Sequence, residues 1–388
     1  MSARMRFGAF MAPFHAELEQ NPTLAFRRDL ETAQLLDRLG YDEVWFGEHH
    51  SAAVELIASP EIFCAWVAAQ TSRIKVGTGV VSLPYHNPFW VADRAILLDH
   101  LTRGRFMLGI GPGILATDAA MIGLDVAGLR DYLKEDFRVL MHLLRSDEPL
   151  SIDTGRYRLV EAQCQLDRYS DFDIALASIT TPSGPLLAGE YGVGLLQLSG
   201  LTPEGMAILP HHWDVMTRQS AQFGTTIDRD NWRVVGIMHI ADTKEQAIED
   251  VRFGMMHYFD YIQVTQGLTD YYQGKTFDER IEWAMSSGTA LIGTPDDAIA
   301  KIGELVDASS GNVGAFLFWA HEWASPRATH HNYELFARRV MPAFQGTTQR
   351  LAEATRVGSR KLPEMNVRSF AAVANFMESH QTNAPREA

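Results

Sequence analysis

The stretch "DEVWFGEHH" (residues 42–50) joins an apolar run, typical of a buried strand, to one glutamate and two histidines. A helical pattern precedes it, "LAFRRDLETAQLLDRLG" (24–40), with apolar residues at helical spacing and a terminal glycine. Another helical pattern follows it, "PEIFCAWVAAQTS" (60–72). Strands that alternate with helices are typical of parallel sheets, so this stretch predicts one strand of such a sheet.

The same alternation continues along the chain. We expect seven further strands, at residues 5–14, 74–84, 105–113, 172–178, 192–199, 232–241 and 313–320. Helical patterns follow the eight strands at residues 24–40, 60–72, 87–104, 129–146, 184–190, 203–222, 243–259 and 328–343. Eight strand–helix units with strands apolar on both faces favour an α/β fold, a closed (β/α)8 TIM barrel, over an open sheet.

The chain is longer than a typical barrel, so we expect an insertion before the last strand–helix unit. The segment at about 260–292 is rich in Tyr, Gly and Gln, and long segments of this kind are usually lids or binding loops. Residues 1–348 are expected to form a single barrel domain. The polar residues 349–388 are expected to form a C-terminal extension that is partly disordered.

The composition argues against several classes of function. The 388 residues carry a net charge of −14, which argues against nucleic acid or an anionic membrane as a partner. Cys64 and Cys164 have no paired spacing, so neither a disulfide framework nor a cysteine zinc site is expected. The chain begins without a signal-peptide pattern and contains no apolar run of roughly 20 residues. These features predict a soluble cytoplasmic protein.

In a TIM barrel the active site lies at the carboxyl ends of the strands. The residues expected at this rim are His15, Glu48, His49, His50, Tyr85, His86, Asn87, Gln197, Ser199, Trp319, His321 and Glu322. A glycine-rich turn, "GIGPG" (109–113), follows the fourth strand, and Asp118 lies just beyond it. Histidines, aromatic residues and glycines at one rim suit a large planar cofactor with acid–base groups around it.

The two histidines also have simpler explanations. Adjacent residues on an extended strand point to opposite sides, so at most one of His49 and His50 faces the barrel. A metal site needs two ligands on one side and a third elsewhere, so the metal interpretation is weakened, and no metal is expected. From the motif alone, a structural strand end and a catalytic group both stay open.

Two further segments suggest phosphate binding. "GPGILA" (111–116) matches the loose dinucleotide pattern GxGxxA, but Pro112 interrupts it and it follows the fourth strand, which discounts the match. "SITTPSGP" (178–185) places hydroxyl groups at the start of an expected helix, where backbone N–H groups bind phosphate. Plain helix capping remains an alternative for its residues Ser178, Thr180, Thr181, Ser183 and Gly184.

Together these segments resemble the bacterial luciferase-like flavin monooxygenases over roughly residues 5–345. The resemblance rests on "RFGAFMAPF", "YDEVWFGEHH", "KVGTGVVSLPYHNP", "LTRGRFMLGIGPG", "LIGTPDDAI" and "RRVMPAF", in this order and spacing. Two blocks, "GPGILATDAAMIGLD" and "FLFWAHEWA", look most like the limonene-monooxygenase-like branch.

The resemblance implies a monooxygenase that uses reduced FMN and O2, through a C4a-(hydro)peroxyflavin, to oxygenate a small organic substrate. It implies a separate flavin reductase as the source of reduced FMN. Members of the family are commonly dimers, so a homodimer is expected through the helices at 60–72 and 87–104. The segment at 260–292 then acts as a lid that excludes water.

The resemblance also implies roles for individual residues. His49 corresponds to the catalytic histidine, and Glu48 or a neighbour tunes it. A non-proline cis peptide is expected between Gly79 and Val80. Many members carry a basic residue at the position of Pro112, so the phosphate contacts here are expected to differ. The full set of expected cofactor-binding residues is Gly79, Val80, Asn87, Gly111, Gly113, Asp118, Ser178, Thr180, Thr181, Ser183, Gly184 and Trp319.

Three other functions remain open from the sequence. An F420-dependent oxidoreductase of the same barrel superfamily would transfer hydride without O2. A non-catalytic flavin-binding relative would keep the barrel and lose the chemistry. A metal-dependent barrel hydrolase would use the histidines as ligands. The substrate, and the choice among epoxidation, Baeyer–Villiger insertion and aldehyde oxidation, is not specified by the sequence.

Overall fold

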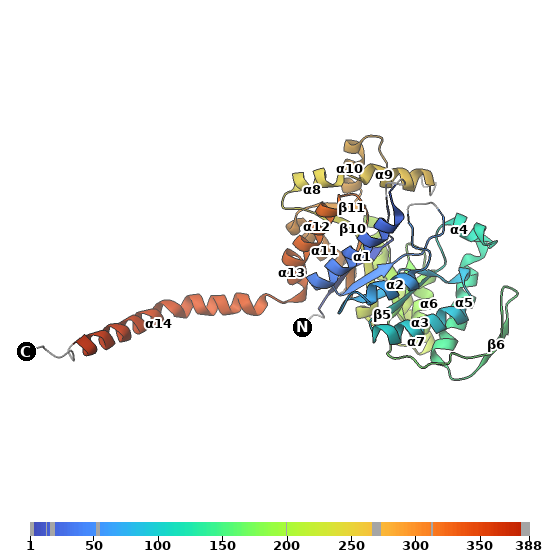
Figure 1. Cartoon of the computed structure of the whole chain (residues 1–388), viewed down its shortest axis with the longest axis horizontal. Helices are drawn as coiled ribbons and strands as arrows, with labels where there is room; N and C mark the ends of the chain where they lie inside the picture. The colour runs from blue at the N-terminus through green and yellow to red at the C-terminus, as the bar shows by residue number, and fades with distance from the viewer. Residues whose placement is uncertain are drawn as a thin grey trace, which may run out of the picture. The chain divides into compact units, whose positions relative to one another are not determined.

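Eight parallel strands close into a barrel in the computed structural model of the chain, which describes residues 4–12, 14–15, 20–51, 55–198, 200–265, 273–311 and 313–381 (Figure 1). Around the barrel their order is β10, β12, β1, β2, β3, β5, β8 and β9, and pairing of β9 with β10 closes it. Their bounds are β1 Arg6–Met11, β2 Glu43–Phe46, β3 Lys75–Thr78, β5 Phe106–Gly111, β8 Ile174–Ser178, β9 Gly194–Gln197, β10 Trp232–Ile240 and β12 Ala315–Trp319. The predicted (β/α)8 barrel is therefore confirmed.

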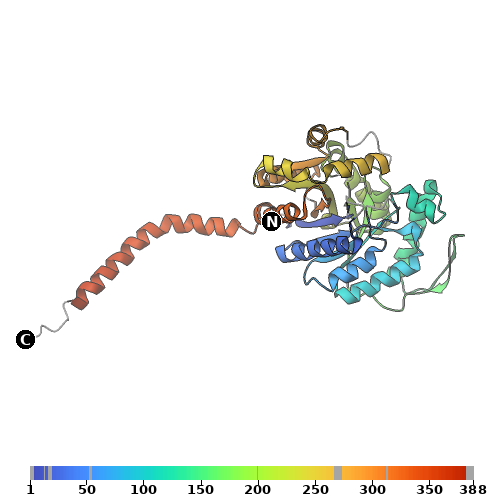
Figure 2. The same cartoon turned by 45° about the horizontal axis from the view of Figure 1, so that its top comes forward.

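Helices enclose the barrel, and most begin at sequence signals that can be read directly. Six of them carry a proline in the first turn, where its missing N–H costs nothing. Gly40 ends the first with a left-handed φ of 84°. The enclosing helices are α1 Pro22–Leu39, α2 Pro60–Ala68, α3 Pro88–Thr102, α5 Leu129–Arg145, α6 Ser183–Tyr191, α7 Pro203–Phe223, α11 Pro295–Ala308 and α12 Pro326–Arg339 (Figure 2).

The third expected strand is interrupted. It consists of β3, the short β4 (Val81–Ser82) and a 3₁₀ turn, η1 (Leu83–Tyr85). The peptide bond between Gly79 and Val80 is cis, as the resemblance implies. Because β4 pairs with β5, the barrel wall stays continuous across the interruption.

Several elements between β5 and β8 were not predicted. They are α4 (Ala116–Met121), a 3₁₀ turn η2 (Val126–Gly128), and a hairpin of β6 (Leu150–Asp153) and β7 (Arg158–Ala162). The hairpin is largely exposed and polar, so its sequence lacks the apolar runs that reveal barrel strands. Asp136 of α5 accepts hydrogen bonds from Arg156 and Tyr157, which lie in the turn that joins the two hairpin strands.

An insertion follows β10. It contains α8 (Lys244–Val251), α9 (Met255–Asp260), a π-helical turn η4 (Tyr261–Thr265), α10 (Phe277–Ser286) and β11 (Ala290–Gly293). The helix expected over 243–259 is thus two helices. They separate at Gly254, where a side chain would collide with the carbonyl oxygen of Glu322. Residues 266–272, within the expected lid, lie outside the described residues.

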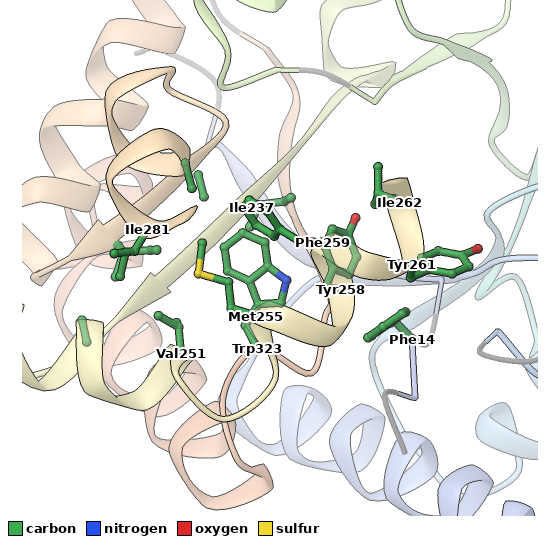
Figure 3. Close-up of a cluster of buried hydrophobic side chains, with 14 of the residues drawn as sticks. Phe14, Ile237, Val251, Met255, Tyr258, Phe259, Tyr261, Ile262, Ile281 and Trp323 are labelled. Atoms are coloured by element: carbon green, nitrogen blue, oxygen red, sulfur yellow. The ribbon is translucent and has the colours of Figure 1, made fainter. Parts of the chain in front are cut away.

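We call α9 and η4 the cap, because they pack over residues that follow the ends of β1 and β12. Phe14, after β1, contacts the rings of Tyr258 and Tyr261, and Trp323, after β12, contacts Tyr258 and Phe259. Figure 3 shows Phe14 beside Tyr261, and Trp323 beside Met255. This apolar core, separate from the one inside the barrel, fixes the described part of the insertion near the carboxyl end of the barrel.

The barrel interior has an ionic lower end and an apolar upper layer. At the amino ends of the strands, fully buried Arg233 binds Glu43 at 2.6 Å and Asp173 at 2.7 Å. This network serves stability, because catalysis in such barrels occurs at the opposite end. Above this network lie buried apolar residues, and the topmost are the partly buried Val80, Leu198 and Trp319.

Residues 342–388 form a second compact unit. Residues 349–388 were expected to form a partly disordered extension, and within them α14 runs from Gln349 to Gln381. Ion pairs one turn apart, Arg356 with Glu353 and Arg368 with Glu364, support this helix locally. Residues 382–388 lie outside the described residues. Within the ranges given above, no helix has both the length and the apolar character needed to cross a bilayer.

Candidate active site

His49 lies between two carboxylates. Its Nδ1 is 3.2 Å from Asp118 Oδ2, and its Nε2 is 2.7 Å from Glu55 Oε2. Asp118 belongs to α4, after β5, and is 1% exposed. It also accepts hydrogen bonds from the backbone N–H of His50 and from the hydroxyl of Ser51. The imidazole is therefore held at both nitrogens.

The two carboxylates set the charge of His49. Burial lowers its pKa, but Glu55 and Asp118 outweigh that effect and raise the pKa to about 10. Burial likewise raises the pKa of Asp118, and the contacts with His49 and Ser51 more than reverse this and lower it. His49 is consequently an imidazolium at neutral pH, with Asp118 ionised beside it.

Glu48 organises a second cluster on the other side of the same segment. It is buried, and it accepts hydrogen bonds from His50 Nε2 at 2.9 Å, His86 Nε2 at 2.7 Å and the backbone N–H of Ser82 at 2.6 Å. Burial raises the pKa of Glu48, but the two histidines outweigh it and lower the pKa. The hydrogen bond to Glu48 raises the pKa of His50. The two histidines of the motif thus turn to different carboxylates.

The resemblance implies that Glu48 or a neighbour tunes His49, and the contacts of the two residues differ. The partners of Glu48 are His50, His86 and Ser82, whereas Asp118 and Glu55 contact His49. β2 ends at Phe46, so residues 47–50 follow their own turn and not the alternation of a strand. No sequence motif marks Glu55, which follows His49 by six positions and reaches it only in the folded chain.

An apolar floor lies at the upper end of the barrel. Val80, Leu198 and Trp319 are partly buried, each at or just after the carboxyl end of a strand, and Trp319 packs against Phe10 with ring centroids 5.6 Å apart. Gly111 is required beneath this floor, since a Cβ atom there would lie 2.7 Å from Cγ2 of Val80. Such a floor fits the flat face of a large aromatic ring system.

A hydroxyl-rich loop follows β8, three strands around the barrel from β2. Thr180 and Thr181 are exposed, Ser183 begins α6, and the hydroxyls of Thr181 and Ser183 are 3.0 Å apart. Ser178 turns inward and donates a hydrogen bond to the carbonyl of Thr181. Hydroxyl donors at a helix N-terminus suit a phosphate group, and the phosphate site expected at this segment stays a prediction.

The remaining predicted residues have structural roles that can be stated directly. Asn87 caps α3 by accepting a hydrogen bond from the backbone N–H of Phe89. Gly113 has a left-handed φ of 86° and faces the hydroxyl of Tyr85, so a side chain there would collide with it. Gly184 packs against the carbonyl of Ala177 in the same way. Ser199 lies outside the described residues.

A neighbouring polar cluster lies beside a small cavity of about 90 Å³. Buried His15 is 3.1 Å from Asp29 and 3.3 Å from Glu322, and Arg28 pairs with Glu322 at 2.8 Å. The structure thus brings together the predicted ends of the first and last strands. Among the described residues, no group of three His, Cys, Asp or Glu side chains is arranged to hold a metal ion.

Comparison with known proteins identifies the family. A family model described as luciferase-like monooxygenase matches residues 5–310. Limonene 1,2-monooxygenase from Rhodococcus erythropolis is 44% identical over 344 residues, covering 88% of this chain and 87% of that protein. 4-Hydroxyprotoasukamycin monooxygenase from Streptomyces nodosus subsp. asukaensis is 39% identical, and the match covers 89% of this chain and 93% of that protein.

Solved structures agree with these sequence relatives. The oxygenating constituent of 3,6-diketocamphane monooxygenase from Pseudomonas putida, a type II Baeyer–Villiger monooxygenase in complex with FMN, matches with a TM-score of 0.73. It is 25% identical and covers 87% of this chain and 98% of its own. An F420-dependent secondary alcohol dehydrogenase, 17% identical with a TM-score of 0.63, shares the fold. The chain belongs to the luciferase-like monooxygenase family.

Proposed function

We propose that this chain uses reduced FMN and O2 to insert one oxygen atom into a small organic substrate. The observation that carries the proposal is His49, held as an imidazolium by Asp118 and Glu55 at the barrel rim that also presents an apolar floor. The two monooxygenases 44% and 39% identical to the chain, and the FMN complex of the diketocamphane enzyme, support the same reaction class.

The residues at the rim fit FMN. Val80, Leu198 and Trp319 would lie against the flavin ring, and the loop from Thr180 to Ser183 would bind the phosphate. Pro112 stands where many family members carry a basic residue, so hydroxyl and backbone N–H donors take a larger share of phosphate binding here. When bound, the reduced flavin supplies the electrons that activate O2.

The chain's own residues then handle protons and water. His49 is charged at neutral pH, so it both stabilises negative charge that develops at the rim and holds a proton for transfer. Asp118 holds the imidazole through Nδ1. Nε2 is therefore the nitrogen that reaches the reacting group, and it must first release its contact with Glu55. The aromatic cap over Phe14 excludes water, which otherwise diverts the oxidant to peroxide.

Two partners complete the proposal. A separate flavin reductase supplies reduced FMN, because the sequence shows no second nucleotide-binding unit. Two copies of the chain pair through α2 and α3, where Ile62 is 74% exposed and Leu101 is 66% exposed. Trp90 and Leu97 add to this apolar surface, and exposed apolar patches of this kind mark interfaces.

The test compares His49→Ala with His50→Ala at saturating reduced FMN, supplied by an unrelated reductase. Product per reduced flavin is measured over a panel of cyclic terpenes, ketones and aldehydes, with hydrogen peroxide measured alongside. His49→Ala should lower product formation roughly 10²–10⁴-fold, with peroxide in place of product, whereas His50→Ala should lower it far less. Normal yield in His49→Ala, or turnover only with reduced F420, would refute the assignment.

A further inference from the structure

Helix α14 (Gln349–Gln381) is strongly two-sided. At about 100° per residue, its large apolar residues other than Val357 and Val367 fall within one arc, and all eight charged residues fall within the opposite arc. Phe370 is 72% exposed and Phe376 is 63% exposed. The apolar arc consists of Leu351, Leu362, Met365, Phe370, Val373, Phe376 and Met377.

The charged arc is already partly satisfied within the helix. Arg356 pairs with Glu353, and Arg368 pairs with Glu364, at 2.7 Å each. Such pairs favour an isolated helix by only a few tenths of a kcal/mol, whereas most helical stability in proteins comes from packing an apolar face. We therefore expect the apolar arc of α14 to pack against a partner surface of similar length.

Charge is distributed unevenly along the helix. Residues 349–361 contain four basic residues and one acidic residue, and residues 362–381 contain one basic and two acidic residues. A parallel pair of such helices would place the basic halves together. An antiparallel pair avoids this, but all eight charges lie on the arc away from an apolar contact, so this electrostatic preference is small and greatest at low ionic strength.

Side-chain size is distributed unevenly as well. Between Leu351 and Leu362, the apolar arc carries only smaller residues, Thr355, Gly358 and Ser359. Beyond Leu362 it is bulky, with two phenylalanines, two methionines and a valine. An antiparallel pair lays bulky side chains against small ones at both ends, whereas a parallel pair would crowd one end and leave the other loosely packed.

We propose that α14 pairs antiparallel with α14 of a second copy of this chain. The arrangement is self-complementary under twofold rotation, so it closes as a dimer contact and does not propagate. It is separate from pairing through α2 and α3 and does not depend on the reaction the barrel performs. The charged arc carries five basic and three acidic residues, a net charge of only +2, so we favour a second copy over an anionic membrane as the occupant and test the membrane separately.

Light scattering on the full chain at micromolar concentration tests the contact. Phe370→Glu with Phe376→Glu should halve the mass of the assembly, whether that assembly is a dimer or a tetramer. Val367→Glu is the matched control: Val367 is 69% exposed on the charged arc, so its replacement should leave the mass unchanged. Equal masses for wild type and the double variant would overturn the proposal. So would the control if it halved the mass as well.

Cross-linking tests the orientation, in a chain carrying Cys164→Ala. Leu351→Cys protein and Phe376→Cys protein should each remain uncross-linked alone under mild oxidation and should form a mixed disulfide dimer when combined. Efficient cross-linking of Leu351→Cys with itself would indicate parallel helices and contradict the proposal. Flotation with phosphatidylglycerol vesicles, lost in the double variant without any change of mass, would assign the arc to lipid instead.

Discussion

Replacing Glu55 with Gln removes one of the two carboxylates that hold His49. Glu55 Oε2 is 2.7 Å from His49 Nε2, and Glu55 Oε1 accepts a hydrogen bond from Tyr261 of the cap at 3.4 Å. Gln keeps the size of the side chain and its contact with Tyr261, and it removes the charge. The side chain of His49 is only 12% exposed, so solvent screens the ion pair little.

The size of the effect follows from the pKa of His49. Burial lowers it, but Glu55 and Asp118 raise it from 6.5 to about 10. That difference corresponds to about 5 kcal/mol of stability, fully present below pH 6.5 and lost as the pH rises to about 10. Because two carboxylates share the effect, Glu55→Gln should destabilise the fold by about 2 kcal/mol at pH 6 to 7, with the difference vanishing near pH 10.

Urea unfolding of both proteins between pH 6 and pH 10 measures this difference. His15, whose pKa burial lowers but Asp29 and Glu322 raise to about 9, contributes equally to both proteins and cancels. Glu61→Gln is the matched control, because buried Glu61 pairs with Arg94 and not with a histidine. A difference between wild type and Glu55→Gln that stays constant from pH 6 to pH 10 would refute the reasoning.

Three further predictions concern the barrel and its cofactor. Arg233→Met leaves buried Glu43 without its main partner and should cost about 3–5 kcal/mol in urea unfolding, more than Arg6→Met on the same carboxylate. Gly111→Ala displaces Val80 from the floor and should weaken reduced-FMN binding at least tenfold in anaerobic titration. Gly303→Ala, which meets no neighbouring atom within 4 Å, should leave that affinity unchanged. The purified chain with FMN and NADH should oxidise NADH no faster than free FMN does, and rapid oxidation would show a reductase site in the chain itself.

The barrel was predictable because every strand is buried on both faces and bounded by glycine, proline and cap residues. β10 (Trp232–Ile240), for example, is buried at all nine positions, and its sequence is apolar apart from Arg233 and His239, which pair with carboxylates. The β6–β7 hairpin escaped prediction because exposed polar strands carry no such signal. α14 was missed for a different reason: its two arcs are legible in the sequence, but its overall polarity suggested disorder.

The site was predictable only in part. His49, Asp118 and the hydroxyl loop after β8 follow strand ends, so the (β/α)8 rule brings them to one rim. The assignment of partners was not predictable, because it depends on contacts between residues far apart in sequence. Tyr261 contacts Glu55 across 206 positions, and His86 contacts Glu48 across 38. No local periodicity in the sequence predicts which carboxylate a histidine will contact.

We propose that this chain transfers one atom of O2 from a reduced-FMN system to an organic substrate. The direct measurement supplies photoreduced FMN anaerobically, adds ¹⁸O2 and limonene, and analyses the product by mass spectrometry, with camphor-type ketones and long-chain aldehydes tested next. We expect a product that carries a single ¹⁸O atom and is formed in preference to hydrogen peroxide. Stoichiometric peroxide without labelled product from any of these substrates, or an unlabelled product formed with reduced F420 in the absence of O2, would contradict it.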